Sequence, residues 1–206
     1  MIDRRTHQSP DATDATLAAG RSQPPGRPRR GVLLQVAACA LALDVATKML
    51  AVARLSDAEP VRLLDGALYL TLARNTGAAF SLGADLTWVF TVVMIVVIAV
   101  IMWVARKVRS VPWALALGLI MGGASGNLVD RLFRAPGAFQ GGVIDFLSLF
   151  HPWGQVWPIF NLADVFIVSG GILAVTLTVF GREIDGTRPR REAARRKNLQ
   201  PRKENA

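Results

Sequence analysis

Three stretches of this sequence carry no charged residue and are apolar enough to cross a membrane as helices. A transmembrane helix needs about 20 mainly apolar residues, and the stretches that meet or approach this length are residues 86–105, 110–129 and 165–181. A fourth stretch, residues 32–53, is apolar apart from Gln35, Asp44 and Lys48, and its Leu, Ala and Val composition suits a helix that faces other helices. The sequence therefore predicts an α-helical membrane protein with four transmembrane helices.

The positive charge of the chain is concentrated outside this apolar body. The net charge is +9, yet residues 31–180 hold nine basic and eight acidic side chains, and the excess lies in residues 1–30 and 181–206. A nearly neutral apolar body, in a chain that is 51% hydrophobic, argues against a soluble nucleic-acid-binding domain and against a disordered chain. We expect no nucleic-acid partner, and we expect both tails to be flexible arms with affinity for anionic lipid headgroups.

The basic residues also predict the orientation of the spans. The second and third spans are joined by the short linker Arg106-Lys107-Val108-Arg109, and with four spans this linker shares a face with both tails. That face carries 18 of the 24 Lys and Arg residues. By the positive-inside rule it is cytoplasmic, so residues 54–85 and 130–160 form the outer loops of a membrane domain that spans residues 31–180.

The outer loops are too apolar to be plain solvated connections. Leu68, Leu70 and Leu72 alternate with less apolar residues, the period of a half-buried strand, which predicts a small extracytoplasmic subdomain containing β-structure. In the second loop, Trp153 and Trp157 stand just before the last span. They fit an aromatic anchor at the membrane surface better than a ligand site.

Several polar or small residues in the spans have a structural interpretation. Asp44 and Lys48 stand four residues apart, acid first, which favours a pair that satisfies itself on one helix face. Glycines recur every fourth residue on the third span, and such a smooth stripe lets another helix approach closely; they are Gly118, Gly122 and Gly126. The single Cys39 follows an apolar segment, as in a lipid-modified signal sequence, but this segment is too short for one and an uncleaved first span fits better.

Two carboxylates flanked by apolar residues are the strongest functional candidates. Asp164 opens the last span on its outer side, and Asp145 precedes it by 19 residues, enough for the intervening loop to bring the two together. Asn127, Asp130 and Arg131 end the third span on the same side, where the two charges could also simply mark the helix end. Two adjacent carboxylates in a poorly solvated place share one proton, which is the arrangement of an aspartic protease.

Other kinds of chemistry have less support. The chain contains two histidines, His7 and His151, and no Cys or His cluster with the spacing of metal ligands. We therefore expect neither a metal nor a cofactor. A transport or proton-relay protein with intramembrane carboxylates and a non-catalytic scaffold remain as alternatives, although a relay needs carboxylates spread across the bilayer.

The sequence resembles the lipoprotein signal peptidases, or signal peptidase II, which are bacterial membrane aspartyl peptidases with four transmembrane helices. The resemblance covers about residues 32–180 and rests on five blocks in the order of that family. They are Asp44-Val45-Ala46-Thr47-Lys48, Asn75-Thr76-Gly77-Ala78-Ala79-Phe80-Ser81, Gly126-Asn127-Leu128-Val129-Asp130-Arg131, Val143-Ile144-Asp145-Phe146 and Phe160-Asn161-Leu162-Ala163-Asp164.

The resemblance implies a function and a set of site residues. It implies that Asp145 and Asp164 form the catalytic dyad, and that the substrate is a prolipoprotein cut just before its diacylglyceryl-modified cysteine. It further implies residues that bind substrate or support the dyad, namely Asn127, Asp130, Arg131 and Asn161, with Asn75 and Gly77 in a loop that closes on substrate and Asp44 as a polar contact nearby. A monomer without cofactor is expected.

Overall fold

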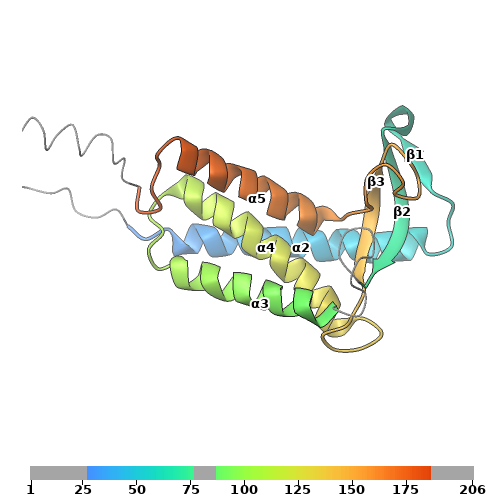
Figure 1. The fold of residues 1–206 in the computed structure, drawn as a ribbon, viewed down its shortest axis with the longest axis horizontal. Coiled ribbons are helices and arrows are strands. Elements are labelled where there is room, and N and C mark those ends of the chain that lie inside the picture. The colour runs from blue at the N-terminus through green and yellow to red at the C-terminus, as the bar shows by residue number, and fades with distance from the viewer. Residues whose placement is uncertain (1–26, 77–86, 187–206) are drawn as a thin grey trace, which may run out of the picture.

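The helices lie side by side and a small sheet stands across one end of them (Figure 1). The computed structural model describes residues 27–76 and 87–186. Within these residues, four helices are long and apolar enough to cross a membrane, which confirms the predicted spans. They are α2 (Arg30–Leu55), α3 (Thr87–Val104), α4 (Val111–Phe133) and α5 (Leu162–Val179).

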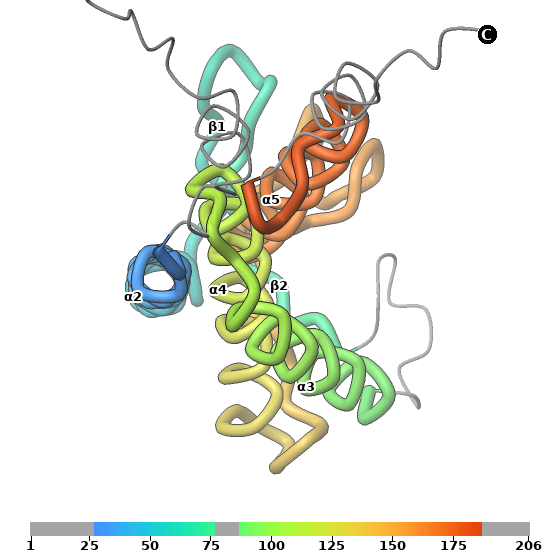
Figure 2. The backbone as a smooth tube through the Cα atoms, turned by 90° about the vertical axis from the view of Figure 1, so that its left-hand side faces the viewer, coloured from blue at the N-terminus to red at the C-terminus, as the bar shows by residue number. Residues whose placement is uncertain are grey.

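Helix α4 lies between the other helices, as the end-on view shows (Figure 2). It packs on α2 through the predicted glycine stripe, where a methyl group would lie 2.8 Å from the Leu33 carbonyl oxygen at Gly118 and 2.6 Å from Ala40 at Gly122. A second contact brings α5 against α4 at Gly123, where a methyl group would lie 2.4 Å from the carbonyl oxygen of Ala163. Because these glycines have no side chain, the helices that carry the polar residues can approach one another closely.

The sheet has three antiparallel strands in the order β1 (Val61–Leu63), β2 (Leu68–Asn75) and β3 (Val143–Leu149). The predicted strand at Leu68–Leu72 is confirmed as part of β2. Strand β3 brings a segment distant in sequence beside it, with Ala73 opposite Asp145. Ile144 of β3 is fully buried in a cluster with Ala51 of α2, which fixes the sheet on the helices.

The connection from β3 to α5 folds back onto the sheet. The backbone amides of Phe146 and Leu147 both donate to the Phe160 carbonyl oxygen, at 3.0 and 2.8 Å, so residue 160 returns to the middle of β3. Between these points, Trp153 and Trp157 leave more than half of their surface exposed. That they anchor the protein at the membrane surface stays a prediction.

At the opposite end of the bundle, the basic linker bonds to the parts of both tails that adjoin the helices. The amide of Arg29 donates to the Val108 carbonyl oxygen at 2.8 Å, and the amides of Arg109 and Ser110 donate to that of Ile184 at 3.0 and 3.1 Å. Ile184 also packs against the core between the helices. The basic linker and the starts of both tails therefore share one end of the bundle, as the topology of four spans requires.

Candidate functional site

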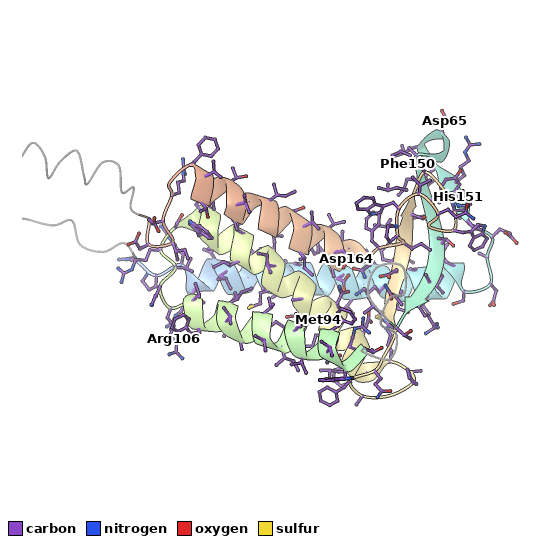
Figure 3. All side chains as sticks on the ribbon, in the orientation of Figure 1. Asp65, Met94, Arg106, Phe150, His151 and Asp164 are labelled. Carbon is purple, nitrogen blue, oxygen red and sulfur yellow. The ribbon has the colours of Figure 1, made fainter. Side chains whose placement is uncertain are left out.

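Asp145 and Asp164 come together at the end of the bundle next to the sheet. Asp145 lies on β3 and Asp164 in the first turn of α5 (Figure 3 labels Asp164). Asn161 contacts both: its side-chain amide donates to Asp145 Oδ1 at 2.6 Å, and its backbone amide donates to Asp164 Oδ2 at 3.1 Å. One asparagine thus holds two carboxylates that stand 19 residues apart in the sequence.

Asp164 is positioned by the way its helix begins. Asn161 is the N-cap residue of α5, and its Oδ1 accepts the backbone amide of Asp164 at 3.1 Å. The Asp164 carboxylate returns a bond to the Asn161 backbone amide, which completes a capping box. This exchange satisfies two donors that the first turn of a helix leaves without partners, so the Asp164 carboxylate is held against the backbone.

Asp145 is positioned by the sheet. Its strand neighbour Asn75, on β2, donates from Nδ2 to Asp145 Oδ2 at 3.1 Å. Because Asn161 occupies the other oxygen, both oxygens of Asp145 accept an amide hydrogen. The return of Phe160 to the middle of β3 places Asn161 within reach of this strand, so the fold of the connection brings the second carboxylate to the first.

Asn127 of α4 links the two carboxylates to the rest of the bundle. Its Nδ2 donates to Asp164 Oδ1 at 3.0 Å, while its Oδ1 accepts from Asn161 Nδ2 at 3.1 Å and from Lys48 Nζ at 2.8 Å. An ammonium group can only donate, so Lys48 requires the oxygen of the Asn127 amide to face it. The nitrogen of that amide is then left to face Asp164.

Lys48 is fully buried and bonds to residues on two helices. Its Nζ lies 2.8 Å from Asp44 Oδ2 and 2.8 Å from Asp130 Oδ2. The predicted pair of Asp44 and Lys48 is present, but it does not satisfy itself, because Lys48 also bonds to Asp130 and Asn127 on α4. Spacing along one helix indicates only neighbours on that helix, so the bridge to α4 could not be predicted from the positions of Asp44 and Lys48.

Two other predicted residues, Asp44 and Asp130, bond to the backbone of the segments that carry the two carboxylates. Asp44 Oδ1 accepts the backbone amide of Ala163 at 2.9 Å, next to the start of α5. Asp130 pairs with Lys48 and with Arg134, and accepts the Ile144 amide at 3.3 Å. Asp130 therefore supports β3 without a bond to either carboxylate of the pair.

Arg131 also ties loops to the helix. Its guanidinium donates to the carbonyl oxygens of Thr76 and Gly141, at 3.3 and 3.4 Å. It is nearly fully buried, and it faces the same cavity as Asp145 and Asp164. Gly77, which follows in the sequence, lies outside the described residues.

A cavity of about 550 Å³ opens in front of the two carboxylates. Asn75, Asn127 and Arg131 form its polar wall together with Asp145 and Asp164. The other walls are mainly apolar, with Phe90 and Met94 from α3, Val165 and Val168 from α5, and Trp157 from the connection. Val168 is 58% exposed, so the cavity reaches the outer surface of the bundle, where lipid would lie.

The surroundings of Asp145 favour its protonated form. Burial, with the adjacent Asp164 carboxylate as the next largest cause, raises the pKa of Asp145 from its ordinary 3.8 to about 7, while the amides of Asn161 and Asn75 oppose this rise. Near neutral pH the pair therefore holds a protonated carboxyl group next to a second carboxyl group, which suits general acid–base chemistry. Within the described ranges, no group of His, Cys, Asp and Glu residues could hold a metal ion.

The structure gathers most of the predicted site at one place. Six of the predicted residues line the same cavity or bond to the two carboxylates: Asn75, Asn127, Arg131, Asp145, Asn161 and Asp164. Asp44 and Asp130 lie one step away, joined to Asn127 through Lys48. Since all these carboxylates are connected at the sheet end, they do not form the path across the bilayer that a proton relay needs.

Comparisons with known proteins agree with the sequence resemblance. Residues 36–180 match the family described as signal peptidase (SPase) II. The lipoprotein signal peptidase of Rhodococcus jostii (strain RHA1) is 46% identical over 198 residues, covering 91% of this chain and 98% of that protein. That of Streptomyces coelicolor is 49% identical over 162 residues, covering 79% of this chain and 77% of that protein.

Solved structures share the fold at lower identity. One bacterial membrane enzyme superposes with a TM-score of 0.60 at 22% identity, covering 85% of this chain and 94% of its own. A second superposes with a TM-score of 0.63 at 23% identity, covering 76% of this chain and 97% of its own.

Proposed function

The chain belongs to the signal peptidase II family, and on this premise we propose that it cuts lipid-modified prolipoproteins just before the lipidated cysteine, with Asp145 and Asp164 as its catalytic dyad. As a member of the family it is a bacterial membrane peptidase of the aspartic type. The observation that carries the dyad is the position of Asn161, which donates hydrogen bonds to both carboxylates at the wall of one cavity.

The proposed reaction needs one proton shared between the two carboxyl groups. Ionised Asp164 takes a proton from a water molecule as the water oxygen attacks the scissile carbonyl carbon. Protonated Asp145 donates its proton to the carbonyl oxygen, which gives a neutral tetrahedral intermediate. When the carbon–nitrogen bond breaks, the proton now on Asp164 passes to the leaving amine and the hydroxyl proton returns to Asp145, so the dyad regains its starting state.

The raised pKa of Asp145 supports this assignment of roles. Asp145 retains its proton up to about pH 7, as a group must if it is to donate to the carbonyl oxygen. Asp164 has three supports for a negative charge: the Asn161 backbone amide, the Asn127 amide and the N-terminus of α5. The surroundings of Asp145 favour its protonated form, so we assign it the role of the acid and Asp164 the role of the base.

The cavity suits a substrate that is apolar on one side. Phe90, Met94, Val165 and Val168 offer walls from α3 and α5 to a hydrophobic signal segment and to acyl chains. Asn161 uses its side-chain donors and its acceptor within the protein, so we assign it the positioning of the dyad. Arg131 and Asn127 face the cavity and are the candidates to contact the substrate backbone, whose polar groups need partners in an apolar place.

We also infer the orientation in the membrane. Figure 3 places Arg106, in the basic linker, and Asp164 at opposite ends of the bundle. If the basic end is cytoplasmic by the positive-inside rule, both termini are cytoplasmic and the dyad acts near the extracytoplasmic face. Asn75, Asn127 and Asn161 of the same chain bond to the two carboxylates, so one copy can form the dyad, and we propose a monomer as the working form.

Substitution of each carboxylate tests the proposal. The purified protein would be incubated with a prolipoprotein carrying a diacylglyceryl-modified cysteine, and the products would be identified by mass. We expect Asp145→Asn and Asp164→Asn to abolish the cut, whereas Asp57→Asn, in the exposed turn after α2, cuts as the unchanged protein does. Undiminished cutting by either dyad variant, or a cut at another bond, would overturn the proposal.

A further inference from the structure

A second and smaller cavity lies on the sheet side of Asp145. Its volume is about 170 Å³, and its walls include Ala73 and Asn75 of β2, Asp145 of β3, and Trp153, Gly154 and Ile159 of the connection. Among the residues that the structure describes, those that line it all come from β2, β3 or this connection, and none comes from the four helices. The small cavity therefore lies outside the layer of membrane-spanning helices.

The two cavities share part of their walls. Asn75, Asp145, Pro158 and Ile159 line both of them. A polypeptide whose scissile bond lies against the Asp145 carboxyl group therefore has the large cavity on one side of that bond and the small cavity on the other. Since the small cavity adjoins a carboxyl group that the proposed reaction uses, a side chain bound there belongs to a residue close to the bond that is cut.

The chemistry of the walls indicates which part of the substrate each cavity takes. The large cavity has helix residues such as Met94 and Val168 on its walls, which suit the hydrophobic segment before the cut and the acyl chains. The chain that follows the cysteine leaves the membrane, and the described walls of the small cavity lie on the sheet side. We propose, building on the proposed function, that the small cavity is the subsite for the side chain of the residue that follows the lipidated cysteine.

The geometry also assigns a size limit to this subsite. A cavity of about 150 Å³ holds a molecule of the size of benzene, so this one accepts a single side chain of moderate size. Gly154 has a positive φ of 70°, and a methyl group there would lie 2.9 Å from Ile159 Cγ1, so the two parts of the connection that line the cavity pack closely against each other. Ala73 stands directly opposite Asp145, on the same face of the sheet. Ala73 is therefore the residue whose size sets the space beside the dyad.

The test changes the size of the subsite and of the substrate side chain together. Three lipidated prolipoprotein peptides would differ only in the residue after the modified cysteine, which is glycine, leucine or tryptophan. Their kcat/KM values would be measured with the unchanged protein, Ala73→Leu and Ala73→Gly. Ala58→Leu is the matched control, because Ala58 is exposed in the connection between α2 and β1 and lines neither cavity.

The expected pattern is a change in preference between substrates. In Ala73→Leu, kcat/KM for the leucine peptide falls about tenfold or more relative to kcat/KM for the glycine peptide. In Ala73→Gly, kcat/KM for the tryptophan peptide rises relative to that for the leucine peptide. Ala58→Leu keeps the preferences of the unchanged protein.

Two failures are distinguishable. Glycine-to-leucine ratios that agree between the unchanged protein and Ala73→Leu would overturn the subsite and leave the proposed function standing. If Ala73→Leu cuts no peptide, Ala73→Gly decides, and an unchanged leucine-to-tryptophan ratio overturns the subsite. Failure of the unchanged protein to cut any peptide before its modified cysteine would instead refute the proposed function.

Discussion

Asn75 gives experimental access to the protonation of the dyad without altering either carboxyl group. It donates a hydrogen bond of 3.1 Å to Asp145, and this bond favours the ionised form, against the burial that raises the pKa of Asp145 to about 7. In the proposed reaction Asp145 must be protonated, so activity falls as the pH rises through that value. Replacing Asn75 with alanine removes a donor to the carboxylate, and the activity should then persist to higher pH.

The size of this effect follows from the kind of bond that is lost. A hydrogen bond to a charged group contributes about 1.5–3 kcal/mol, and the protonated carboxyl group still accepts part of it. The difference between the two protonation states is then near the lower end of that range, and about 1.4 kcal/mol corresponds to one pKa unit. The alkaline limb of the profile, at about 7 in the unchanged protein, should move upward by about one unit.

The assay is kcat/KM for a lipidated peptide, measured from acidic to alkaline pH and scaled to its own maximum. Scaling separates the midpoint of the limb from any loss of substrate contact in Asn75→Ala. Thr76→Val is the control, because it changes the next residue and no bond from the Thr76 side chain to Asp145 is present in the described structure. An alkaline limb that stays in place, or moves to lower pH, in Asn75→Ala would refute the assignment of this limb to Asp145.

Three further predictions concern stability. The pKa of Asp145 lies near 7 in the folded protein, above its ordinary 3.8, so this group destabilises the fold increasingly as the pH rises between these values. Asp145→Asn should therefore stabilise the protein by up to about 4 kcal/mol near pH 8 and not near pH 4. Thermal unfolding at both pH values checks this. Lys48→Met removes the buried cation that Asp44 and Asp130 share and should destabilise the protein by about 3–5 kcal/mol. Denaturant unfolding should show partial recovery when Asp44→Asn is added, and full stability of the single variant would contradict the bridge. Gly122→Ala places a methyl group 2.6 Å from a side chain of α2 and should destabilise by about 1–3 kcal/mol, whereas Gly171→Ala, with nothing within 4 Å of the added carbon, should not; equal melting temperatures would argue against this packing.

The membrane spans could be predicted because hydropathy is a property of contiguous sequence. Each of the four predicted stretches overlaps one of the observed helices, and their ends differ by a few residues. Hydropathy predicts the last span from residue 165, whereas α5 begins at Leu162 because Asn161 and Asp164 form a capping box. Hydropathy cannot place that start, since the box consists of polar residues that a search for apolar stretches leaves out.

The sheet and the polar network were harder to predict, because both depend on residues far apart in the sequence. The alternation at Leu68–Leu72 indicated β2, whereas β3 is buried on both faces over Val143–Phe146 and lacks such an alternation. The approach of Asp145 to Asp164 could be expected from their shared side of the membrane. The role of Lys48 could not, because its partners Asp130 and Asn127 lie on another helix.

The capping box at the start of α5 has a consequence for inhibitors directed at this protein. The Asp164 carboxylate caps the first turn of α5, and its partner Asn161 also holds Asp145. A substitution at position 164 that weakens an inhibitor would remove the proposed base, and loss of a capping contact costs about 1 kcal/mol of stability. Resistance through this position would therefore impair catalysis and folding together, which makes the Asp164 carboxylate a durable contact for an inhibitor.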